Sequence, residues 1–347
     1  MVTLALVAAF AGNAFALEPK RTGQESFLSR AVFADGQLWL LSDAGELSSI
    51  AEGKDNRVEA ALPEPALDLC LHDGRPAVIT CRRKGCTDWT LRRWTDGRWS
   101  VEAKIQRHND EIVALSCAGP VVTLVTTRRI IDLVGDNHSA VPLSEPLRPG
   151  PVTSVHVTQQ KVFVGINAGE WGGGLRRIDR KTGKITNVES DVTGELCKGP
   201  LNSKCDPVNG IASEPWNPDC VAIAVGLVHF EPHGRIVEVC GNKVQRLYFK
   251  PYGSEASGDQ TTGNSDEPFS TVAFFGLVRQ GDTLWAVGID GIYRIDAGGA
   301  TQLTPLPAFR NIGGIRVSFD SPQVILVLTN INRRRSISGS IPILVPR

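Results

Sequence analysis

Short apolar runs alternate with polar turns along this chain in one repeated order. An apolar strand, a tight polar turn, a second apolar strand and a Gly-containing turn recur about every forty residues. The clearest copies are Arg30–Ile50, Val152–Asp179 and Phe274–Ile295, and weaker copies are Ala66–Thr80, Ile112–Thr126, Val208–Val225 and Ile315–Leu328. Apolar residues do not recur at helical spacing, and 21 prolines are spread through the chain. The pattern therefore predicts a protein built from short strands.

Repeats of this length that are rich in strand formers are typical of β-propeller blades. We predict an all-β fold, a single seven-bladed β-propeller with four-stranded antiparallel blades, with six or eight blades as alternatives. The predicted blades are Phe27–Leu62, Pro65–Ile105, Asp110–Leu143, Gly150–Val192, Asp206–Phe249, Phe269–Leu306 and Asn311–Val345. Open sheet edges invite pairing with other chains, so we expect residues Lys20–Leu28 to complete the last blade.

One repeat contains a more specific motif. Gly173-Gly174-Leu175 is followed by Arg177-Ile178-Asp179, and residues 291–296 repeat the second half of this motif. The segment resembles the repeats of two-component-regulator propellers, which are WD40/YVTN-like. The resemblance covers two repeats well and the others loosely, so it implies the fold more than a function. Those sensors usually continue into a membrane span and a kinase, which we do not expect here.

The first residues have the features of an export signal. Leu4–Phe10 is a short apolar stretch, and Ala14-Phe15-Ala16 matches the small-x-small pattern of a cleavage site. We predict a signal peptide at residues 1–16 and a single propeller domain at residues 17–347, with a buried first strand as the alternative. No later apolar run is long enough to cross a bilayer. We therefore expect an exported protein, periplasmic or extracellular, without a transmembrane segment.

Cysteine usage agrees with export, because an even number of eight cysteines is natural in an oxidising compartment. The candidate disulfides are Cys70–Cys117, Cys81–Cys86, Cys197–Cys205 and Cys220–Cys240. The close pairs bracket short turns, and Cys70 and Cys117 hold equivalent places in consecutive repeats. No paired C-x-x-C spacing is present, so we predict no metal site.

Charge and motifs exclude several classes of function. Lys+Arg and Asp+Glu both number 37, which argues against binding nucleic acid by bulk electrostatics. The chain has no G-x-S-x-G, H-E-x-x-H, Walker or G-x-G-x-x-G motif. We assign no catalytic residue and no cofactor, and we favour a monomeric binding module over an enzyme.

The longest loops point to one face of the predicted ring. In a four-stranded meander the turn between the second and third strands shares a face with the link to the next blade. The predicted long loops are Asn167–Gly174, Leu227–Gly234, Glu195–Asn209 and Lys250–Pro268. Long loops on a rigid scaffold usually carry binding residues, although neutral lengthening is the alternative. We predict a ligand site on this face, formed by blades 4 to 6.

Eight residues on this face are candidates for ligand binding. They are Asn167, Glu170, Trp171, Asp206, Asn209, His229, His233 and Asp290. A tryptophan beside a carboxylate suits a carbohydrate, a peptide or a cationic group, and the ligand class stays open between small molecule, carbohydrate and protein. The structural alternatives are that Trp171 plugs the gap between blades and that the polar residues only form turns.

A second functional hypothesis is a propeller hydrolase or lyase that acts on a sugar, lactone or ester. Histidine can serve as a general base near neutral pH. In this hypothesis His229 or His233 would work with a nearby carboxylate, Glu170 or Asp206.

Overall fold

The computed structural model describes residues 28–54, 57–82, 84–117, 121–135, 137–147, 152–190, 199–253, 270–305, 315–321, 324–330 and 340–346. Regular structure in these residues is β-strand, apart from one short 3-10 helix, η1 (Gly169–Trp171). The predicted signal peptide lies outside the described residues, as do most of the Lys250–Pro268 loop and the proposed closing segment before Leu28. Within the described part of the chain, no helix is long and apolar enough to span a membrane.

Each sheet is formed by consecutive antiparallel strands in chain order. Blade 1 contains β1 (Leu28–Ala34), β2 (Gln37–Ser42), β3 (Leu47–Ala51) and β4 (Arg57–Glu59); blade 2 contains β5 (Ala66–His72), β6 (Arg75–Thr80), β7 (Asp88–Thr95) and β8 (Arg98–Gln106); blade 3 contains β9 (Ile112–Ser116), β10 (Val122–Thr126), β11 (Arg129–Val134) and β12 (Asn137–Pro142). Blade 4 contains β13 (Val152–Val157), β14 (Lys161–Asn167), β15 (Gly173–Asp179) and β16 (Ile185–Val188); blade 5 contains β17 (Val208–Ser213), β18 (Cys220–His229), β19 (Glu231–Cys240) and β20 (Lys243–Tyr248); blade 6 contains β21 (Phe274–Gln280), β22 (Thr283–Gly288), β23 (Gly291–Asp296) and β24 (Gly299–Thr304). The last sheet contains β25 (Ile315–Ser321), β26 (Val324–Asn330) and β27 (Ser340–Pro346).

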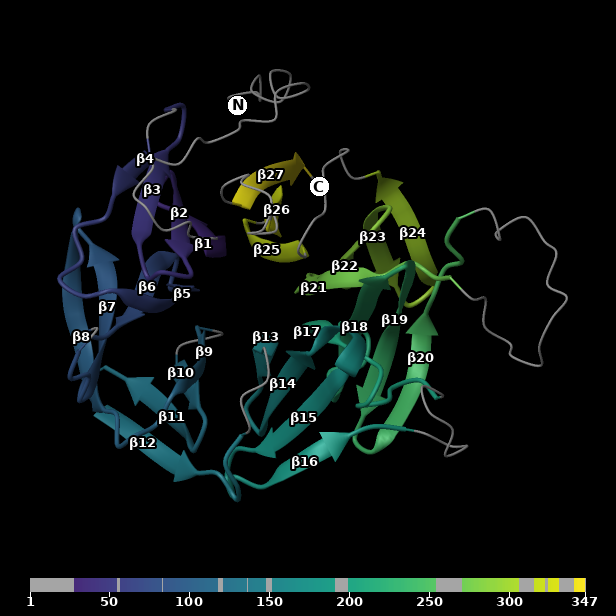
Figure 1. The fold of residues 1–347 in the computed structure, drawn as a ribbon, viewed down its shortest axis with the longest axis horizontal. Helices are drawn as coiled ribbons and strands as arrows, with labels where there is room; N and C mark the ends of the chain where they lie inside the picture. Colours follow the sequence, from purple (N-terminus) through teal and green to yellow (C-terminus); the bar gives the residue numbers. More distant parts are fainter. Residues whose placement is uncertain are drawn as a thin grey trace, which may run out of the picture.

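The sheets stand around a ring, with the first strand of each sheet near the middle and the fourth strand of each blade at the outside (Figure 1). The last sheet lies between blade 6 and blade 1, because β21 contacts β25 and β1 contacts β25 and β26. This arrangement is a β-propeller. The all-β prediction is therefore confirmed.

The preferred number of seven blades is wrong, and the alternative of six is confirmed. The structure has six four-stranded blades instead of seven, and the seventh repeat forms a sheet of only three strands among the described residues. This repeat is short in sequence: the segment between β26 and β27 carries the basic run Arg333–Arg335 where another apolar run would be needed. Leu28 begins β1 of blade 1, so it does not complete the last sheet.

Local sequence explains the hairpins. The turns Asp35-Gly36, Asp73-Gly74 and Asp96-Gly97 each place both residues at positive φ, between 49° and 76°. Two consecutive left-handed residues make the hairpin turn whose twist matches that of the strands it joins, and Asp-Gly adopts it readily. The Asp-Gly pairs therefore determine where these hairpins turn.

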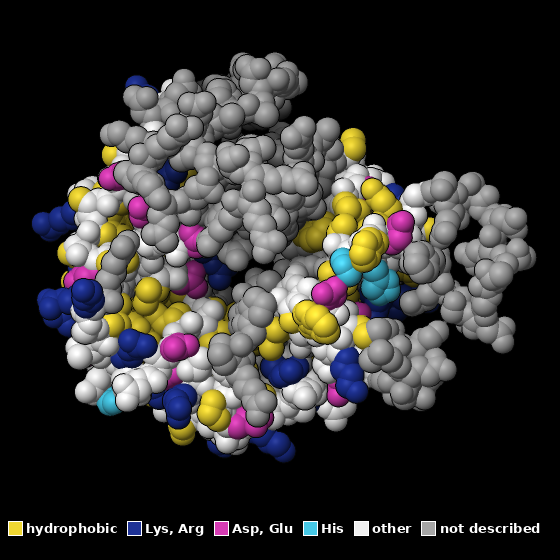
Figure 2. All heavy atoms as spheres, viewed as in Figure 1, with side chains coloured by type: hydrophobic (Ala, Val, Ile, Leu, Met, Phe, Trp, Pro, Cys, Tyr) yellow, Lys and Arg dark blue, Asp and Glu magenta, His cyan; other side chains and the backbone are white. Residues whose placement is uncertain are grey.

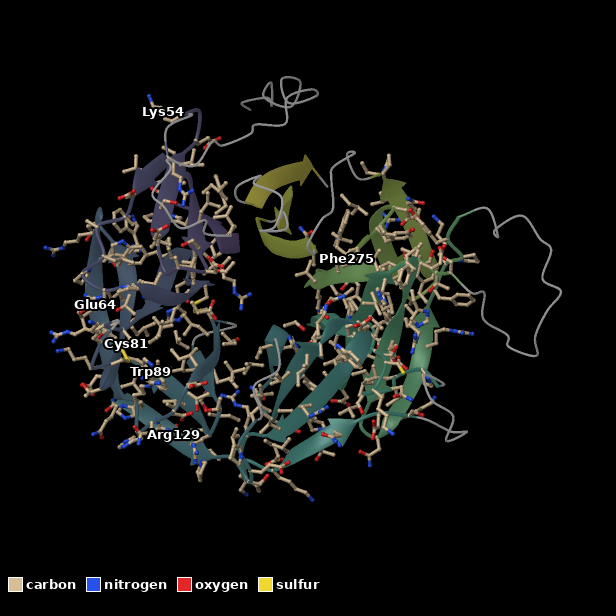
Figure 3. All side chains as sticks on the ribbon, in the orientation of Figure 1. Lys54, Glu64, Cys81, Trp89, Arg129 and Phe275 are labelled. Carbon is tan, nitrogen blue, oxygen red and sulfur yellow. A yellow bond between two sulfur atoms is a disulfide. The ribbon has the colours of Figure 1, made fainter. Side chains whose placement is uncertain are left out.

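Packing between neighbouring blades forms the core. In β18, Val221 and Ile223 pack in one cluster with blade 4, whereas Ala222 and Ala224 pack in another with blade 6. Successive side chains of a strand point to opposite faces of the sheet, so a strand that is apolar on both faces is covered on both sides. Likewise Trp89 on β7 is buried between blades 2 and 3, close to Cys81 (Figure 3).

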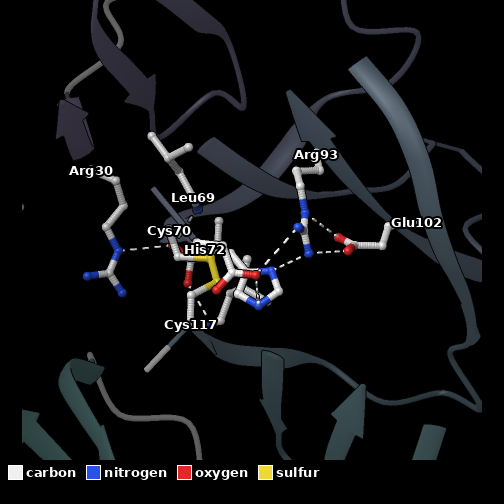
Figure 4. The surroundings of a disulfide bond; sticks show 10 residues. Arg30, Leu69, Cys70, His72, Arg93, Glu102 and Cys117 are labelled. Atoms are coloured by element: carbon white, nitrogen blue, oxygen red, sulfur yellow. Dashed lines mark hydrogen bonds and ion pairs between the residues drawn. A yellow bond between two sulfur atoms is a disulfide. The ribbon is translucent and has the colours of Figure 1, made fainter. Parts of the chain in front are cut away.

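Covalent and polar links join the blades where they approach the ring's middle. The Cys70–Cys117 disulfide connects β5 of blade 2 to the end of β9 in blade 3 (Figure 4). Close to it, one oxygen of Asp68 pairs with Arg30 of blade 1 at 2.9 Å, and the other accepts the backbone N–H of Leu115 at 2.8 Å. A single carboxylate thus connects three blades.

The disulfide predictions are confirmed where they can be checked. Cys81–Cys86 and Cys220–Cys240 are bonded, in addition to Cys70–Cys117. Cys205 is also disulfide-bonded, and its predicted partner Cys197 lies outside the described residues.

Candidate functional site

The turn between β14 and β15 carries the first exposed candidates. After Asn167 the chain forms the 3-10 turn η1, which leaves the Trp171 side chain 78% exposed. Trp171 is therefore not a plug between blades. The Asn167 side-chain oxygen accepts the backbone N–H of Gly169 at 2.8 Å and so holds the start of the turn.

The three glycines after Trp171 have a structural reason. Gly172, Gly173 and Gly174 all have positive φ, and a Cβ atom at Gly172 would overlap the backbone of Lys204. The backbone N–H of Gly173 donates to the carbonyl of Ser203 at 2.9 Å. Glycine is needed here because two backbones meet without room for side chains. The turn is thereby held against the link between blades 4 and 5.

The second segment of the site differs from its prediction. Leu227–Gly234 is not a loop: β18 and β19 remain paired as far as His229 opposite Glu231. The turn is made at Phe230 alone, which has a φ of 64°. Backbone pairing continues from Leu227 opposite His233 to His229 opposite Glu231, so both histidines lie on an extended hairpin.

The two segments meet at their exposed ends. Nδ1 of His229 lies 3.1 Å from Oε2 of Glu170, and both side chains are about half exposed. The ring of His229 is 4.4 Å from that of Phe230, whose side chain is 93% exposed. We call Glu170, Trp171, Val228, His229 and Phe230 the rim patch. Figure 2 shows histidine side chains beside hydrophobic and acidic ones where this hairpin reaches the surface.

Two predicted ligand residues lie beneath the patch and link the blades. The Asn167 amide donates to Oδ1 of Asn209 at 2.6 Å. The Asn209 amide donates in turn to the carbonyls of Gly226 at 2.7 Å and Phe274 at 2.9 Å. These bonds connect blades 4, 5 and 6. The pair therefore positions the elements that carry the patch.

Two more predicted residues, Asp206 and His233, contact the buried Arg235. Asp206 is buried, and its Oδ2 accepts the backbone N–H of Asn202 and pairs with Nη2 of Arg235, both at 2.6 Å. Arg235 also lies 3.0 Å from Nε2 of His233 and donates to the carbonyl of Pro200 at 2.8 Å. The sequence analysis missed Arg235, although a lone arginine in an apolar strand signals a buried partner.

The last candidate, Asp290, holds its own blade together. Its carboxylate lies 2.7 Å from Nζ of Lys250 and accepts the hydroxyl of Tyr293 at 2.7 Å. Burial, reinforced by this carboxylate, raises the pKa of the Tyr293 hydroxyl, so the hydroxyl stays a donor. Asp290 therefore has structural partners in blade 6 and in the link that leads to it, namely Tyr293 and Lys250.

Comparison with known proteins supports the fold only. No protein-family model and no curated protein matches the chain. Among solved structures, it is similar to YCF48 bound to D1 peptide (12% identity, 92% of this chain and 93% of that chain, TM-score 0.54). It is also similar to U3-55K (11% identity, 94% and 97%, TM-score 0.54). At these identities the similarity shows the β-propeller fold.

A further similarity covers only part of the other protein. The extracellular domain of a putative one-component system from B. thetaiotaomicron has 14% identity and a TM-score of 0.47. The match covers 88% of this chain but 37% of that chain.

Proposed function

We propose that this protein is an exported interaction module that binds an extended peptide segment of a partner protein at the rim patch. The observation that carries the proposal is the pair of exposed aromatic side chains, Trp171 and Phe230, which flank the Glu170–His229 contact. The three disulfides between described cysteines support an exported protein, since such bonds persist in oxidising compartments.

Large exposed aromatics on a rigid support favour a protein partner. Tryptophan and other aromatic residues supply much of the binding energy at protein interfaces, and a rigid residue loses little entropy on binding. Here Phe230 is held at the tip of a paired hairpin, and Trp171 stands on a turn anchored by the glycines. The similar propeller YCF48 has been seen with a peptide bound, which supports the same use of this fold.

The exposed carboxylates of the site favour a partner segment that carries a basic side chain. Glu170 and Glu231 are exposed beside the two aromatic rings. A lysine or arginine can stack on an aromatic face while its charged end meets a carboxylate. We therefore expect the bound segment to place a basic residue between Trp171 and Glu170, with apolar residues against Phe230.

A library of short peptides displayed on phage tests the proposal. Selection on the purified protein should enrich sequences with a basic residue next to apolar ones, and binding of a selected synthetic peptide is then measured by calorimetry. Trp171→Ala and Phe230→Ala should each weaken that binding about tenfold or more. Val134→Ala, an exposed apolar residue in blade 3, is the matched control and should leave it unchanged.

Two results would overturn the proposal. One is a library that enriches no sequence family on the wild-type protein. The other is a selected peptide that binds the Trp171→Ala/Phe230→Ala double variant as tightly as it binds the wild type.

The Glu170–His229 contact also favours one second function, a hydrolase or lyase. A carboxylate that accepts from one imidazole nitrogen leaves the other nitrogen free to act as a base. Screening sugar, lactone and ester substrates tests this function. Turnover that is lost in both His229→Ala and Glu170→Gln would support the enzyme, whereas turnover that survives in both would exclude this pair as its catalytic group.

A further inference from the structure

The opposite end of the β18–β19 hairpin holds a buried cluster that the rim patch does not use. Glu214 directly follows β17, Cys220 begins β18, and Glu238 and Cys240 lie at the end of β19. The two cysteines are paired across the strands and form a disulfide. The cluster therefore sits at the end of blade 5 that is remote from Phe230.

Glu214 is the unusual member of this cluster. Its side chain is 0% exposed, no hydrogen bond of normal geometry reaches either carboxylate oxygen, and the polar groups nearest to them belong to Glu238 and Trp216. Burying a carboxylate without a partner is costly, so such a group indicates an absent proton or cation. Glu238, also buried, is oriented by a hydrogen bond from the Gln245 amide.

The four groups are close enough to share one ion. One oxygen from each glutamate and the two sulfur atoms all lie within 4.8 Å of one another. A tetrahedral zinc site with bonds of about 2.0–2.3 Å needs ligand atoms at this kind of spacing. Thiolates together with carboxylates suit zinc rather than calcium or magnesium, which prefer oxygen ligands alone.

The two sulfur atoms can bind a metal ion as thiolates only after the disulfide is reduced. In the structure each sulfur is bonded to the other, and a disulfide sulfur is not a thiolate ligand. A dithiol can reduce this bond: its two thiols are oxidised to a disulfide, and Cys220 and Cys240 become two thiols. Cys240 is partly exposed, which gives the reductant a sulfur to attack. On binding zinc the two thiols release two protons.

We propose that Glu214, Cys220, Glu238 and Cys240 form a zinc site that opens when a dithiol reduces the Cys220–Cys240 disulfide. The oxidised protein holds its hairpin end with a covalent bond, and the reduced protein holds the same end with a metal ion. The sequence spacing alone argues against zinc because the ligands come from three separate segments. The proposal is independent of what binds at the rim patch.

The test uses the full chain and zinc chloride. The protein is reduced, freed of reductant without oxygen, loaded with zinc and desalted, and its metal content is measured by mass spectrometry. Reduced wild type should retain one zinc ion more per chain than reduced Cys220→Ser/Cys240→Ser. Oxidised wild type should not retain this extra ion. Cys70→Ser/Cys117→Ser is the matched control: it removes another disulfide and should keep the extra ion.

A second measurement identifies the ligands. Cobalt in place of zinc should give thiolate charge-transfer absorption in reduced wild type and not in Cys220→Ser/Cys240→Ser. Glu214→Gln keeps the size of the side chain and should weaken zinc binding about tenfold or more.

Three outcomes would overturn the proposal. Equal zinc content in reduced wild type and reduced Cys220→Ser/Cys240→Ser is the first. Cobalt absorption without thiolate charge transfer is the second. The third is a reduced chain that loses its circular dichroism signal and does not recover it when zinc is added.

Discussion

The two ends of the β18–β19 hairpin are built from the same pair of strands but meet opposite environments. One end exposes His229 and Phe230, and the other buries Cys220 and Glu238. The change occurs near the Gly226–Gly234 pair, where a Cβ atom on either glycine would collide with the backbone of blade 6. Beyond this point Pro232 is still buried and accepts hydrogen bonds from Ser270 and Thr271, whereas Val228, His229 and Phe230 at the tip are exposed. Neighbouring sheets, not the strand sequence, thus decide which end is available to a partner.

The largest effect on stability should come from a substitution in β19 close to the point where the hairpin changes from buried to exposed. Arg235→Met removes the positive charge that pairs with the buried Asp206 carboxylate, so we expect a loss of about 3–5 kcal/mol in the free energy of unfolding. Urea unfolding followed by circular dichroism measures it. Arg235→Met/Asp206→Leu should recover part of the loss, and a single variant within about 1 kcal/mol of wild type would contradict the assignment.

The pH dependence of stability tests the packing near the buried end of the hairpin. His156 on β13 lies 2.8 Å from the Ser213 hydroxyl, next to Glu214, and burial lowers the pKa of His156 to about 4. Because the unfolded chain then binds the proton more tightly, this neutral histidine contributes stability above pH 6.5 that is lost as the pH falls towards 4.

The matched variant for this effect is His156→Gln. The stability difference between wild type and the variant should shift against wild type by at most about 3 kcal/mol between these two pH values, since one pKa unit corresponds to about 1.4 kcal/mol. Urea unfolding at a series of pH values measures the difference. Parallel stability curves would show that His156 is not desolvated in the folded protein.

Two glycines test whether the exposed end depends on close backbone contact. Gly172 and Gly53 have similar φ values, 74° and 68°, but only Gly172 faces a neighbouring backbone. Alanine at either position should cost about 1–2 kcal/mol from the left-handed conformation, and at Gly172 a further 1–3 kcal/mol from the overlap. Thermal and urea unfolding compare the two, and equal losses would refute the packing argument.

The smallest expected effect concerns the rim patch itself. Trp171→Ala and Phe230→Ala should change the free energy of unfolding by no more than about 0.5 kcal/mol, because exposed side chains contribute little to folding. The same unfolding measurements provide this value. A larger loss in either variant would mean that the side chain packs in the fold and is not held out for a partner.

Sequence patterns predicted the blades better than the site. Strand periodicity and Asp-Gly turns locate the blades within a few residues, since both signals are local. The last repeat differs from the prediction because its apolar runs form a sheet of three strands among the described residues, not four. Cys70 and Cys117 were predictable as a pair because equivalent places in consecutive repeats lie side by side in a ring.

The site needed information that no local pattern contains. Glu170 and Trp171 were found from their glycine-rich turn. Phe230 was missed although it lies in the predicted loop Leu227–Gly234, because a phenylalanine has no polar group and is usually buried. Asp206, Asn209 and Asp290 resemble ligands in sequence, whereas in the structure they bond to other blades or to their own.

What the sequence by itself determined is the repeating strand unit, because alternation and turn chemistry act over a few residues. Only the tertiary structure decided that Glu170 meets His229 at one end of blade 5 and that Glu214 meets a disulfide at the other. These contacts join segments that are far apart in the chain. Their geometry follows from how the blades pack around the ring, where small differences in strand length decide which side chains are covered.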